Sequence, residues 1–392
     1  MLKNKINVTL LILINIIFFT LCGCNNISTE TSSISLDFSK EQTSIHEIGL
    51  IDDVEIFHLD YNKALFGEVD KILRYKDRIY LLDSRQTKSV IVYDSVGQLI
   101  NVISNYGQGP NNYLQLIDIF IDTVEATLNI VSRMDSKILI YDLNGSQLLK
   151  TYKTPKSFWN VVKTQEGYIG YMGNWSQDRM KPYNVWIMTQ ALNLEKYFFK
   201  IDPTWESKGL GGRNVFSCFQ SSTYFITPMD YNIYRIENDH VSIAYSFDLG
   251  RLSWPIETMD YESYTKLIRD PTQPYICHFY NFQETSNHLI VHVLYRGQYL
   301  FGVYNKNSKK IYIANLDHYT GKYFFNFGTI IGFDEKTIYT LVDASNMKNY
   351  VNGKNQYVDF ESKYPQQIKN LREKFDYVDE DDNPYLVMYH IN

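Results

Sequence analysis

The chain has 392 residues and a net charge of −6, and its 33 tyrosines and 22 phenylalanines favour β-strands. A chain with this acidic balance lacks the basic surface that nucleic-acid binding requires, so no nucleic-acid partner is expected. The 4 cysteines form no Cys/His cluster at metal-site spacing, so we predict neither a metal nor a cofactor.

The first residues have the layout of a secretory signal. Lys3 and Lys5 precede an apolar run from Val8 to Leu21, and the small residue Gly23 stands directly before Cys24. This segment resembles the lipobox of bacterial lipoproteins, in which the cysteine becomes the first mature residue and carries acyl chains. We therefore predict a lipoprotein signal peptide over residues 1–23 and lipidation of Cys24.

Two alternatives remain open at this end of the chain: an ordinary signal peptide and an N-terminal membrane anchor. The apolar run is short for a membrane-spanning helix and is interrupted by Asn15. Cleavage before Cys24 would remove two lysines and no acidic residue, so the net charge would change from −6 to −8. An anionic membrane surface would repel such a domain, so the lipid itself would have to anchor it.

The segments 24–48 and 49–392 differ in composition. The first is rich in Ser, Thr and Glu and almost free of aromatic residues, which predicts a flexible tether. The second predicts one folded domain that begins with short alternating strands. Its first four predicted strands are Val69–Tyr75, Arg78–Asp83, Ser89–Tyr93 and Gln98–Ile103. An antiparallel meander of four strands has the size of one propeller blade.

The same unit recurs along the chain. An apolar strand, a polar loop, a strand ending in Tyr-Asp and a glycine turn appear in this order twice, once up to Gly97 and once up to Gly145. Such an internal repeat predicts stacked blades. Later copies are predicted at Phe158–Lys200, Asn214–Leu249, Ile276–Leu316 and from Tyr323 onward, which gives six blades in all.

The two ends of the domain predict how the ring closes. Val54–Leu59 precedes the first full blade, and Pro384–Ile391 follows the last one. Because an open ring would leave exposed strand edges, we expect these two strands to pair in a shared sixth blade. The predicted fold class is therefore all-β: a six-bladed β-propeller with short helical insertions, whose N-terminal strand closes the last blade.

Two segments interrupt the strand pattern. Ile256–Arg269 and Phe360–Phe375 have helical spacing of their apolar residues, and both are predicted as helical insertions. The acidic run Asp379–Asp382 is predicted as a solvated loop. A calcium site is the alternative, but the run lacks the spaced ligands and the glycine of the known calcium-binding loop.

A family resemblance rests on short motifs in the first blades and at the end of the chain. These are Ile79–Asp83, Val92–Asp94, Gly97, Gly107–Tyr113 and Asp382–Val387. They resemble the six-bladed β-propeller lipoproteins of gut-type Gram-negative bacteria, which are relatives of NHL-repeat propellers. That group usually has Glu where this chain has Asn112. The resemblance implies the fold and the lipid anchor, and little about activity, because a fold does not determine function.

Known catalytic motifs are missing from the sequence. It has no nucleophile elbow, no His-Glu-x-x-His motif and no glycine loop followed by Lys-Ser or Lys-Thr. Gly107 and Gly109 stand before Pro110, which has no N–H group, and no helix follows. We therefore predict that this loop crosses between blades, where glycine permits positive φ, and does not bind phosphate.

The histidines and the later cysteines leave alternatives open. His288 and His292 share one face of a predicted strand, where packing partners are the expected role and a metal site lacks a third ligand. Cys218 and Cys277 are expected to be buried free thiols. A disulfide between them is the alternative in an oxidising compartment.

Arginines recur in four of the six loops expected between the second and third strands of the blades. Such loops lie on one face of a propeller, around the channel mouth. We hypothesise that they converge on an anionic or polyhydroxylated ligand, such as an acidic glycan or a peptide carboxylate, through bidentate contacts and stacking on tryptophan. Alternatively, each arginine pairs with an acid of its own blade, such as Asp83 or Asp135. The candidate ligand-binding residues are Arg85, Arg133, Trp175, Arg179 and Arg296.

Taken together, these features predict a lipid-anchored, non-catalytic propeller that binds a glycan or a protein partner on this face. We expect it in the cell envelope, anchored by its lipid at the outer membrane, with the periplasmic or surface side left open. The alternative is a propeller enzyme acting on glycans or lactones. Such an enzyme would need a buried carboxylate or histidine cluster with shifted pKa values at the channel mouth.

Overall fold

The computed structural model describes residues 32–39, 43, 45, 48–60, 64–209, 214–227, 230–237, 240–255, 260–267, 270, 272–276, 279–296, 298–315, 328–352, 361–362, 364–374, 378 and 382–392. The predicted signal peptide, Cys24 and Cys277 therefore lie outside the described residues, as does most of the acidic run at 379–382. No helix in the described part of the chain is both long enough and apolar enough to span a membrane.

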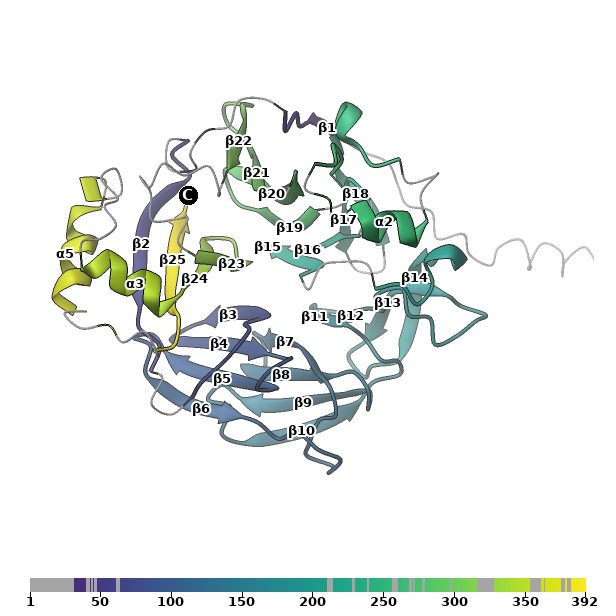
Figure 1. The fold of residues 1–392 in the computed structure, drawn as a ribbon. Helices are drawn as coiled ribbons and strands as arrows, with labels where there is room; N and C mark the ends of the chain where they lie inside the picture. The colour runs from purple at the N-terminus through teal and green to yellow at the C-terminus, as the bar shows by residue number, and fades with distance from the viewer. Residues whose placement is uncertain are drawn as a thin grey trace, which may run out of the picture.

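Six sheets are arranged in a ring, as blades of a β-propeller (Figure 1). Each blade has an antiparallel meander of four strands, and the innermost strands β3, β7, β11, β15, β19 and β23 lie nearest the centre of the ring in Figure 1. The predicted fold class and the predicted number of blades are confirmed. Such a ring positions loops from distant parts of the sequence on one face.

The blades follow one another in sequence. Blade 1 consists of β3 (Lys71–Tyr75), β4 (Arg78–Asp83), β5 (Ser89–Asp94) and β6 (Leu99–Ile103). Blade 2 consists of β7 (Leu116–Asp122), β8 (Thr127–Ser132), β9 (Lys137–Asp142) and β10 (Leu148–Lys153). Blade 3 consists of β11 (Asn160–Lys163), β12 (Gly167–Tyr171), β13 (Tyr183–Thr189) and β14 (Leu194–Lys200).

The second half of the ring is built in the same way. Blade 4 consists of β15 (Phe216–Phe219), β16 (Ser222–Ile226), β17 (Asn232–Glu237) and β18 (His240–Asp248), with one added strand described below. Blade 5 consists of β19 (Phe279–Glu284), β20 (His288–Tyr295), β21 (Gln298–Asn305) and β22 (Ile311–Asn315). Blade 6 consists of β23 (Gly328–Phe333), β24 (Thr337–Val342), β25 (Tyr385–Ile391) and β2 (Ile51–Phe57).

The Tyr-Asp and glycine repeat of the first two blades is a turn motif. Asp94 accepts hydrogen bonds from backbone N–H groups of the turn that follows β5, and Asp142 does the same after β9. Gly97 has a φ of 85° and Gly145 a φ of 67°, in the left-handed region that glycine adopts most readily. The sequence repeat therefore reflects a repeated turn between the third and fourth strands of a blade.

The ring closes as predicted from its two ends. Strand β2 pairs antiparallel with β25, with Val54 opposite Tyr389, so that β2 forms the outer edge of blade 6. Val54, Val387 and Tyr389 are buried in the same core cluster. This pairing joins an early strand of the domain to its last strand and covers the outer edge of β25.

The N-terminal segment corrects the predicted tether over residues 24–48. Ser32–Ser35 form β1, which pairs parallel with β18 as a fifth strand of blade 4. Ile34, Leu36 and Phe38 are buried in the core shared with blades 4 and 5. Alternating apolar residues place their side chains on one face of an extended segment, and here Leu36 and Phe38 pack against Gly302 of blade 5. The folded domain therefore begins at least as early as Ser32, not near residue 49.

Short helices are inserted into the strand scaffold. The helix α2 (Tyr261–Leu267) lies within the predicted segment Ile256–Arg269, and α5 (Pro365–Lys374) lies within Phe360–Phe375. The structure adds the helix α3 (Ala344–Val351) and the 3-10 helices η1 (Pro203–Trp205) and η2 (Gly250–Leu252). The helix α3 is stabilised by Met347 and Tyr350, which are buried against blade 6.

The loop Gly107–Tyr113 crosses from blade 1 to blade 2, as predicted. A Cβ atom at Gly109 would lie 2.7 Å from Asn112 Oδ1, so the asparagine side chain packs against the glycine backbone. Tyr113 is fully buried, and its hydroxyl lies 3.2 Å from the carbonyl oxygen of Ile103. The loop is thus a packed structural crossing, and Asn112 occupies the space over its glycines.

Candidate functional site

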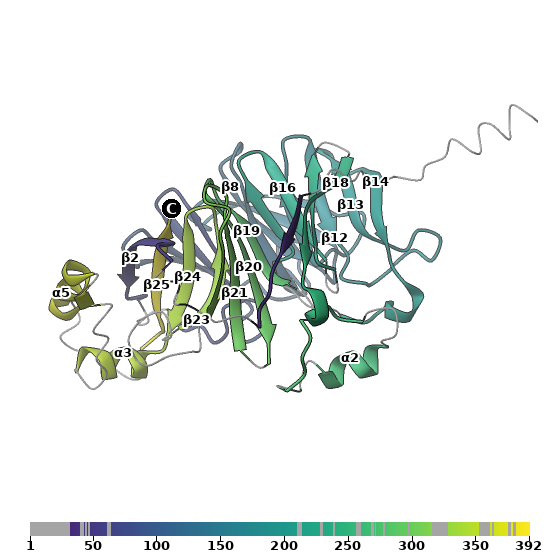
Figure 2. The same ribbon diagram turned by 90° about the horizontal axis from the view of Figure 1, so that it is seen from above.

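We use the term loop face for the end of the ring that carries the second-to-third-strand connections and the connections between blades. Both kinds of connection leave a blade at the same end, because the strands of each meander alternate in direction. Figure 2 shows α2, which connects blades 4 and 5, and α3, which connects β24 and β25, projecting from the same side. Loops on a rigid scaffold are common places for binding residues.

Arg133 lies between two tryptophans on this face. Its Cζ atom is 4.3 Å from the ring centroid of Trp159 and 5.4 Å from that of Trp175. Arg133 follows β8 in blade 2, whereas Trp159 precedes β11 and Trp175 follows β12 in blade 3. The structure therefore brings the predicted residues Arg133 and Trp175 together and adds Trp159, which the sequence interpretation missed.

The Arg133 site holds polar atoms that lack partners. Within the described residues, Arg133 forms no ion pair, and its Nε atom and Trp159 Nε1 are buried without a hydrogen bond. The side-chain oxygen of Gln115 is also buried without a partner, and the Gln115 carbonyl accepts the Arg133 N–H at 2.9 Å. Burial lowers the pKa of Arg133, but a guanidinium stays charged at neutral pH. The site thus combines one cation with unused donors and an acceptor.

The other predicted arginines occupy different surroundings. Arg85 pairs with Glu68 at 3.3 Å, and both side chains are largely exposed. Arg179 is exposed on the β12–β13 connection that also carries Trp175. Arg296 lines a cavity of about 470 Å³ between blades 4 and 5, together with Arg251. The candidate arginines were expected to converge at one channel mouth. They occupy separate places on the loop face instead, because equivalent loops are distributed around the ring.

The acids suggested as arginine partners have structural roles instead. Asp83 is fully buried and accepts backbone N–H groups of the β4–β5 connection, including those of Gln86 and Thr87. Burial acts to raise its pKa, but these hydrogen bonds outweigh that effect and hold the Asp83 pKa below its usual range. Asp135 pairs with Lys137 at 2.8 Å. Asp83 accepts the backbone N–H of Arg85 at 3.2 Å, but within the described residues neither acid forms an ion pair with the guanidinium of its own loop.

The central channel is a second cavity, of about 430 Å³, lined by the inner strands of all six blades. Lys71 and Asp118 form an ion pair in its wall. Cys218 lines the channel as a free thiol and is exposed there, so the expected burial of this thiol is wrong. Desolvation by the surrounding channel wall raises the pKa of Cys218, which disfavours the reactive thiolate. Cys277 lies outside the described residues, so the disulfide alternative stays a prediction.

The paired histidines are part of the sheet. His288 and His292 lie on β20, where both are buried. His292 stacks on Phe301 with ring centroids 5.0 Å apart, and His288 Nδ1 lies 3.1 Å from the Asn392 carbonyl oxygen. Within the described residues, no three His, Cys, Asp or Glu side chains are grouped as a metal site would require.

Solved structures share this fold. A Bacteroides fragilis NCTC 9343 protein described as exported matches with a TM-score of 0.73 and 18% identity, over 92% of this chain and 100% of its own. A DUF4221 family member from Bacteroides vulgatus ATCC 8482 matches with a TM-score of 0.51 and 10% identity, over 88% of this chain and 97% of its own. At such identities the likeness supports the fold alone.

No curated protein matches this chain. The resemblance to NHL-repeat lipoproteins stays a prediction, because the matching family model is described only as a domain of unknown function. That model covers residues 31–390, which include β1 and the whole propeller. The chain therefore belongs to the family of the domain of unknown function DUF4934.

Proposed function

We propose that this protein is a lipid-anchored binding protein of the cell envelope that recognises an acidic glycan on its loop face. The observation that carries the proposal is the position of the Arg133 guanidinium between the rings of Trp159 and Trp175. No catalytic step is part of the proposal.

The chemistry of Arg133 suits an acidic group. A guanidinium that packs against indole rings can still offer N–H groups, and these match a carboxylate in a bidentate arrangement. The two tryptophans also restrict the orientation of the side chain. This lowers the entropy cost of holding the arginine in one geometry when a ligand binds.

The chemistry of Trp175 suits a sugar ring. Its side chain is 40% exposed, so part of the indole is available beside the Arg133 contact. A large apolar ring next to a cation provides packing area and charge recognition in one place. Acidic sugars combine a carboxylate with a ring that can pack against an indole, which is why we favour an acidic glycan over a peptide.

The N-terminal sequence supports the proposed location. Lys3, Lys5, the apolar run and Cys24 have the order of a lipoprotein signal. The Bacteroides fragilis structural neighbour is described as exported, which agrees with a position outside the cytoplasm. Labelling cells with an alkyne fatty acid tests the anchor: we expect incorporation into the wild type and none into Cys24→Ala.

Binding is tested with full-length protein in non-ionic detergent and a trisaccharide of galacturonic acid, measured by titration calorimetry. Arg133→Met should weaken binding by about tenfold or more, as expected when one charge-assisted contact is lost. Arg133→Lys should restore only part of the affinity, because lysine cannot bind a carboxylate in a fork. Trp175→Ala should weaken binding as well.

The controls separate charge, stacking and folding. The methyl-esterified trisaccharide has no charge and should bind weakly. Arg85→Met removes an arginine on the same face that already pairs with Glu68, so it should leave binding unchanged. If the wild type does not bind the acidic trisaccharide, or if Arg133→Met binds it equally well while folded, the proposal is wrong.

A further inference from the structure

The second feature of the loop face is the cavity of about 470 Å³ between blades 4 and 5. Arg251 and Leu252 enter it from η2, directly after β18. Tyr295 and Arg296 enter it from the end of β20. Volumes of this size are typical of sites for small molecules. The cavity is separate from the Arg133 site, which belongs to blades 2 and 3.

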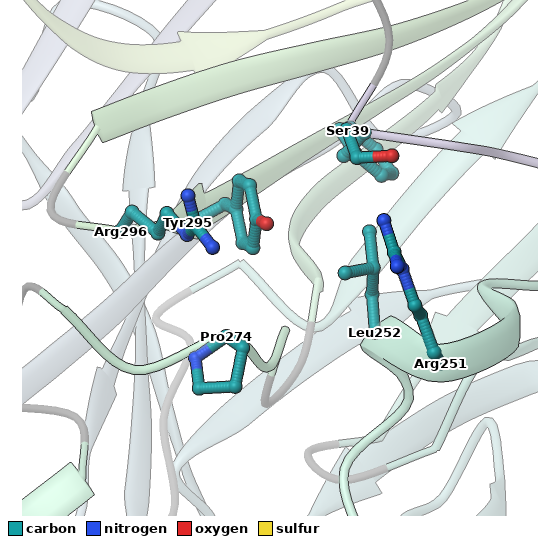
Figure 3. Close-up of a pocket in the computed structure, with 7 residues that line it drawn as sticks. Ser39, Arg251, Leu252, Pro274, Tyr295 and Arg296 are labelled. Carbon is teal, nitrogen blue, oxygen red and sulfur yellow. The ribbon is translucent and has the colours of Figure 1, made fainter.

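Two cations face this cavity without a protein counter-charge. Among the described residues, neither Arg251 nor Arg296 forms an ion pair, and no acidic side chain lines the cavity. Figure 3 shows the two guanidinium groups on opposite sides of the open space, with Arg296 beside the ring of Tyr295. Two separated cations favour a ligand with two separated negative charges.

The walls between the two arginines are apolar. Leu252 and Tyr295 are buried, and Pro274 forms the floor in the view of Figure 3. The hydroxyl group of Tyr295 points toward the space in front of Leu252 and Arg251 (Figure 3). This hydroxyl can donate a hydrogen bond to a carboxylate, while the apolar walls exclude water from the middle of a ligand.

The N-terminal segment forms the remaining wall. Phe38 and Ser39 line the cavity a few residues after β1, and Phe38 is buried. The Ser39 hydroxyl donates to Asp37, so it does not offer its proton to an anion. The donors that remain for a ligand are therefore the two arginines and Tyr295. A ligand bound in this cavity would therefore contact the N-terminal segment at Phe38 and Ser39.

We propose that this cavity binds a small organic dianion whose two carboxylates are separated by a short apolar chain. Each carboxylate pairs with one guanidinium, and the chain lies against Leu252, Phe38 and Pro274. A guanidinium holds a carboxylate through two parallel hydrogen bonds, which gives the site directional preference as well as charge. This inference goes beyond the proposed glycan recognition and does not depend on it.

The test uses the full-length protein in non-ionic detergent and a series of linear dicarboxylates: succinate, adipate and suberate. Titration calorimetry should show binding with an optimum length within the series. Hexanoate, which has one charge, and adipamide, which has none, should bind at least about tenfold more weakly than the best dicarboxylate, because one or both charged contacts are missing.

Matched variants locate the site. Arg251→Gln and Arg296→Gln should each weaken dicarboxylate binding by about tenfold or more, and the double variant should abolish it. Arg133→Lys and Arg85→Gln change arginines elsewhere on the loop face and should leave it unchanged. Ligand should also slow hydrogen exchange of the segment Leu36–Ser39, because Phe38 and Ser39 form a wall.

Several outcomes would overturn the inference. These are failure of every dicarboxylate to bind the wild type, equal binding of hexanoate and adipate, and unchanged binding by the folded double variant. Loss of binding in Arg133→Lys alone would instead place the dianion at the glycan site. The two proposals can therefore fail separately.

Discussion

The ammonium group of Lys71 lies 2.7 Å from Oδ1 of Asp118, across the boundary between blades 1 and 2. Asp118 is only 1% exposed, and its other oxygen accepts the N–H of Val161 from blade 3 at 3.0 Å. One carboxylate therefore connects three successive blades at the wall of the channel. No spacing rule in the sequence pairs these residues, because they meet only after the ring has formed.

We predict a measurable coupling between Lys71 and Asp118. Removing one partner of a buried pair leaves the other uncompensated, so Asp118→Asn should lower the free energy of unfolding by about 3 kcal/mol. A double-mutant cycle with Lys71→Met should give a coupling of about 1–3 kcal/mol in urea unfolding. The exposed helical pair Lys266 and Glu262 is the matched control and should give no measurable coupling. Additive effects at Lys71 and Asp118 would contradict the prediction.

His292 should make the stability of the protein sensitive to acid. Burial lowers its pKa to about 3, against about 6.5 for an ordinary histidine. Its Nδ1 atom lies 3.2 Å from Asn281 Nδ2, and its ring stacks on Phe301. Below pH 6.5 the His292 side chain binds a proton in the unfolded chain but stays neutral in the folded protein. The free energy of unfolding therefore falls as pH decreases from about 6.5 toward 3, by up to about 1.4 kcal/mol per pH unit.

Substitution of His292 tests this assignment. His292→Gln keeps an acceptor for Asn281 but cannot take up a proton. Urea unfolding at pH 7, 6 and 5 should therefore show a slope that is smaller than in the wild type by about one proton. Some slope should remain, because burial also lowers the pKa of His288 and acts in the same direction. An identical slope in wild type and variant would show that His292 titrates normally.

Tyr113 should contribute to stability through its hydroxyl group. The hydroxyl lies near the backbone carbonyl oxygens of Ile103 and Lys88, and burial raises the Tyr113 pKa, so the group stays a hydrogen-bond donor. Tyr113→Phe should lower the free energy of unfolding by about 1–2 kcal/mol, because a buried carbonyl loses its donor. Tyr106→Phe, at an exposed position of the same loop, should change it by less than about 0.5 kcal/mol. Equal effects would contradict the prediction.

The blade pattern was predictable because it is local. Each blade is a meander of adjacent strands, so alternation and turn residues such as Asp94 and Gly97 specify it within a short stretch of sequence. The pairing of β2 with β25 was also predictable, since a closed ring leaves few other partners for two single strands. Both features follow from general rules about strand patterns and strand pairing.

The candidate sites were less predictable, since they depend on neighbours in space. Arg133 and Trp175 were selected from loop positions, but Trp159 stands just before an inner strand, and only the contact between blades 2 and 3 brings it to the arginine. Arg251 lies in a connection between blades, which the focus on second-to-third-strand loops left out. The strand β1 did have a local signal: apolar Ile34, Leu36 and Phe38 alternate with polar residues.

Packing of this N-terminal segment depends on Gly302 in β21. A Cβ atom at this position would lie 2.9 Å from Val291 Cγ2, 3.0 Å from Phe38 Cζ and 3.1 Å from Leu36 Cδ1. Contacts that short force neighbours to move, and overpacking typically costs about 1–3 kcal/mol. Val291 lies in β20, which pairs with a strand on each side, whereas β1 is an added edge strand. We therefore expect the N-terminal segment to move rather than Val291.

Gly302→Ala should therefore release the segment from blades 4 and 5 with a loss of about 1–2 kcal/mol in the free energy of unfolding. Hydrogen exchange of Ser32–Ser35 should increase, because these residues would lose their pairing with β18. Gly209→Ala is the matched control, since a Cβ atom there meets nothing within 4 Å. Because Phe38 walls the cavity that holds Arg251 and Arg296, Gly302→Ala should also weaken dicarboxylate binding without changing either arginine. Normal exchange of β1 together with unchanged stability would show that the segment does not depend on the space at Gly302.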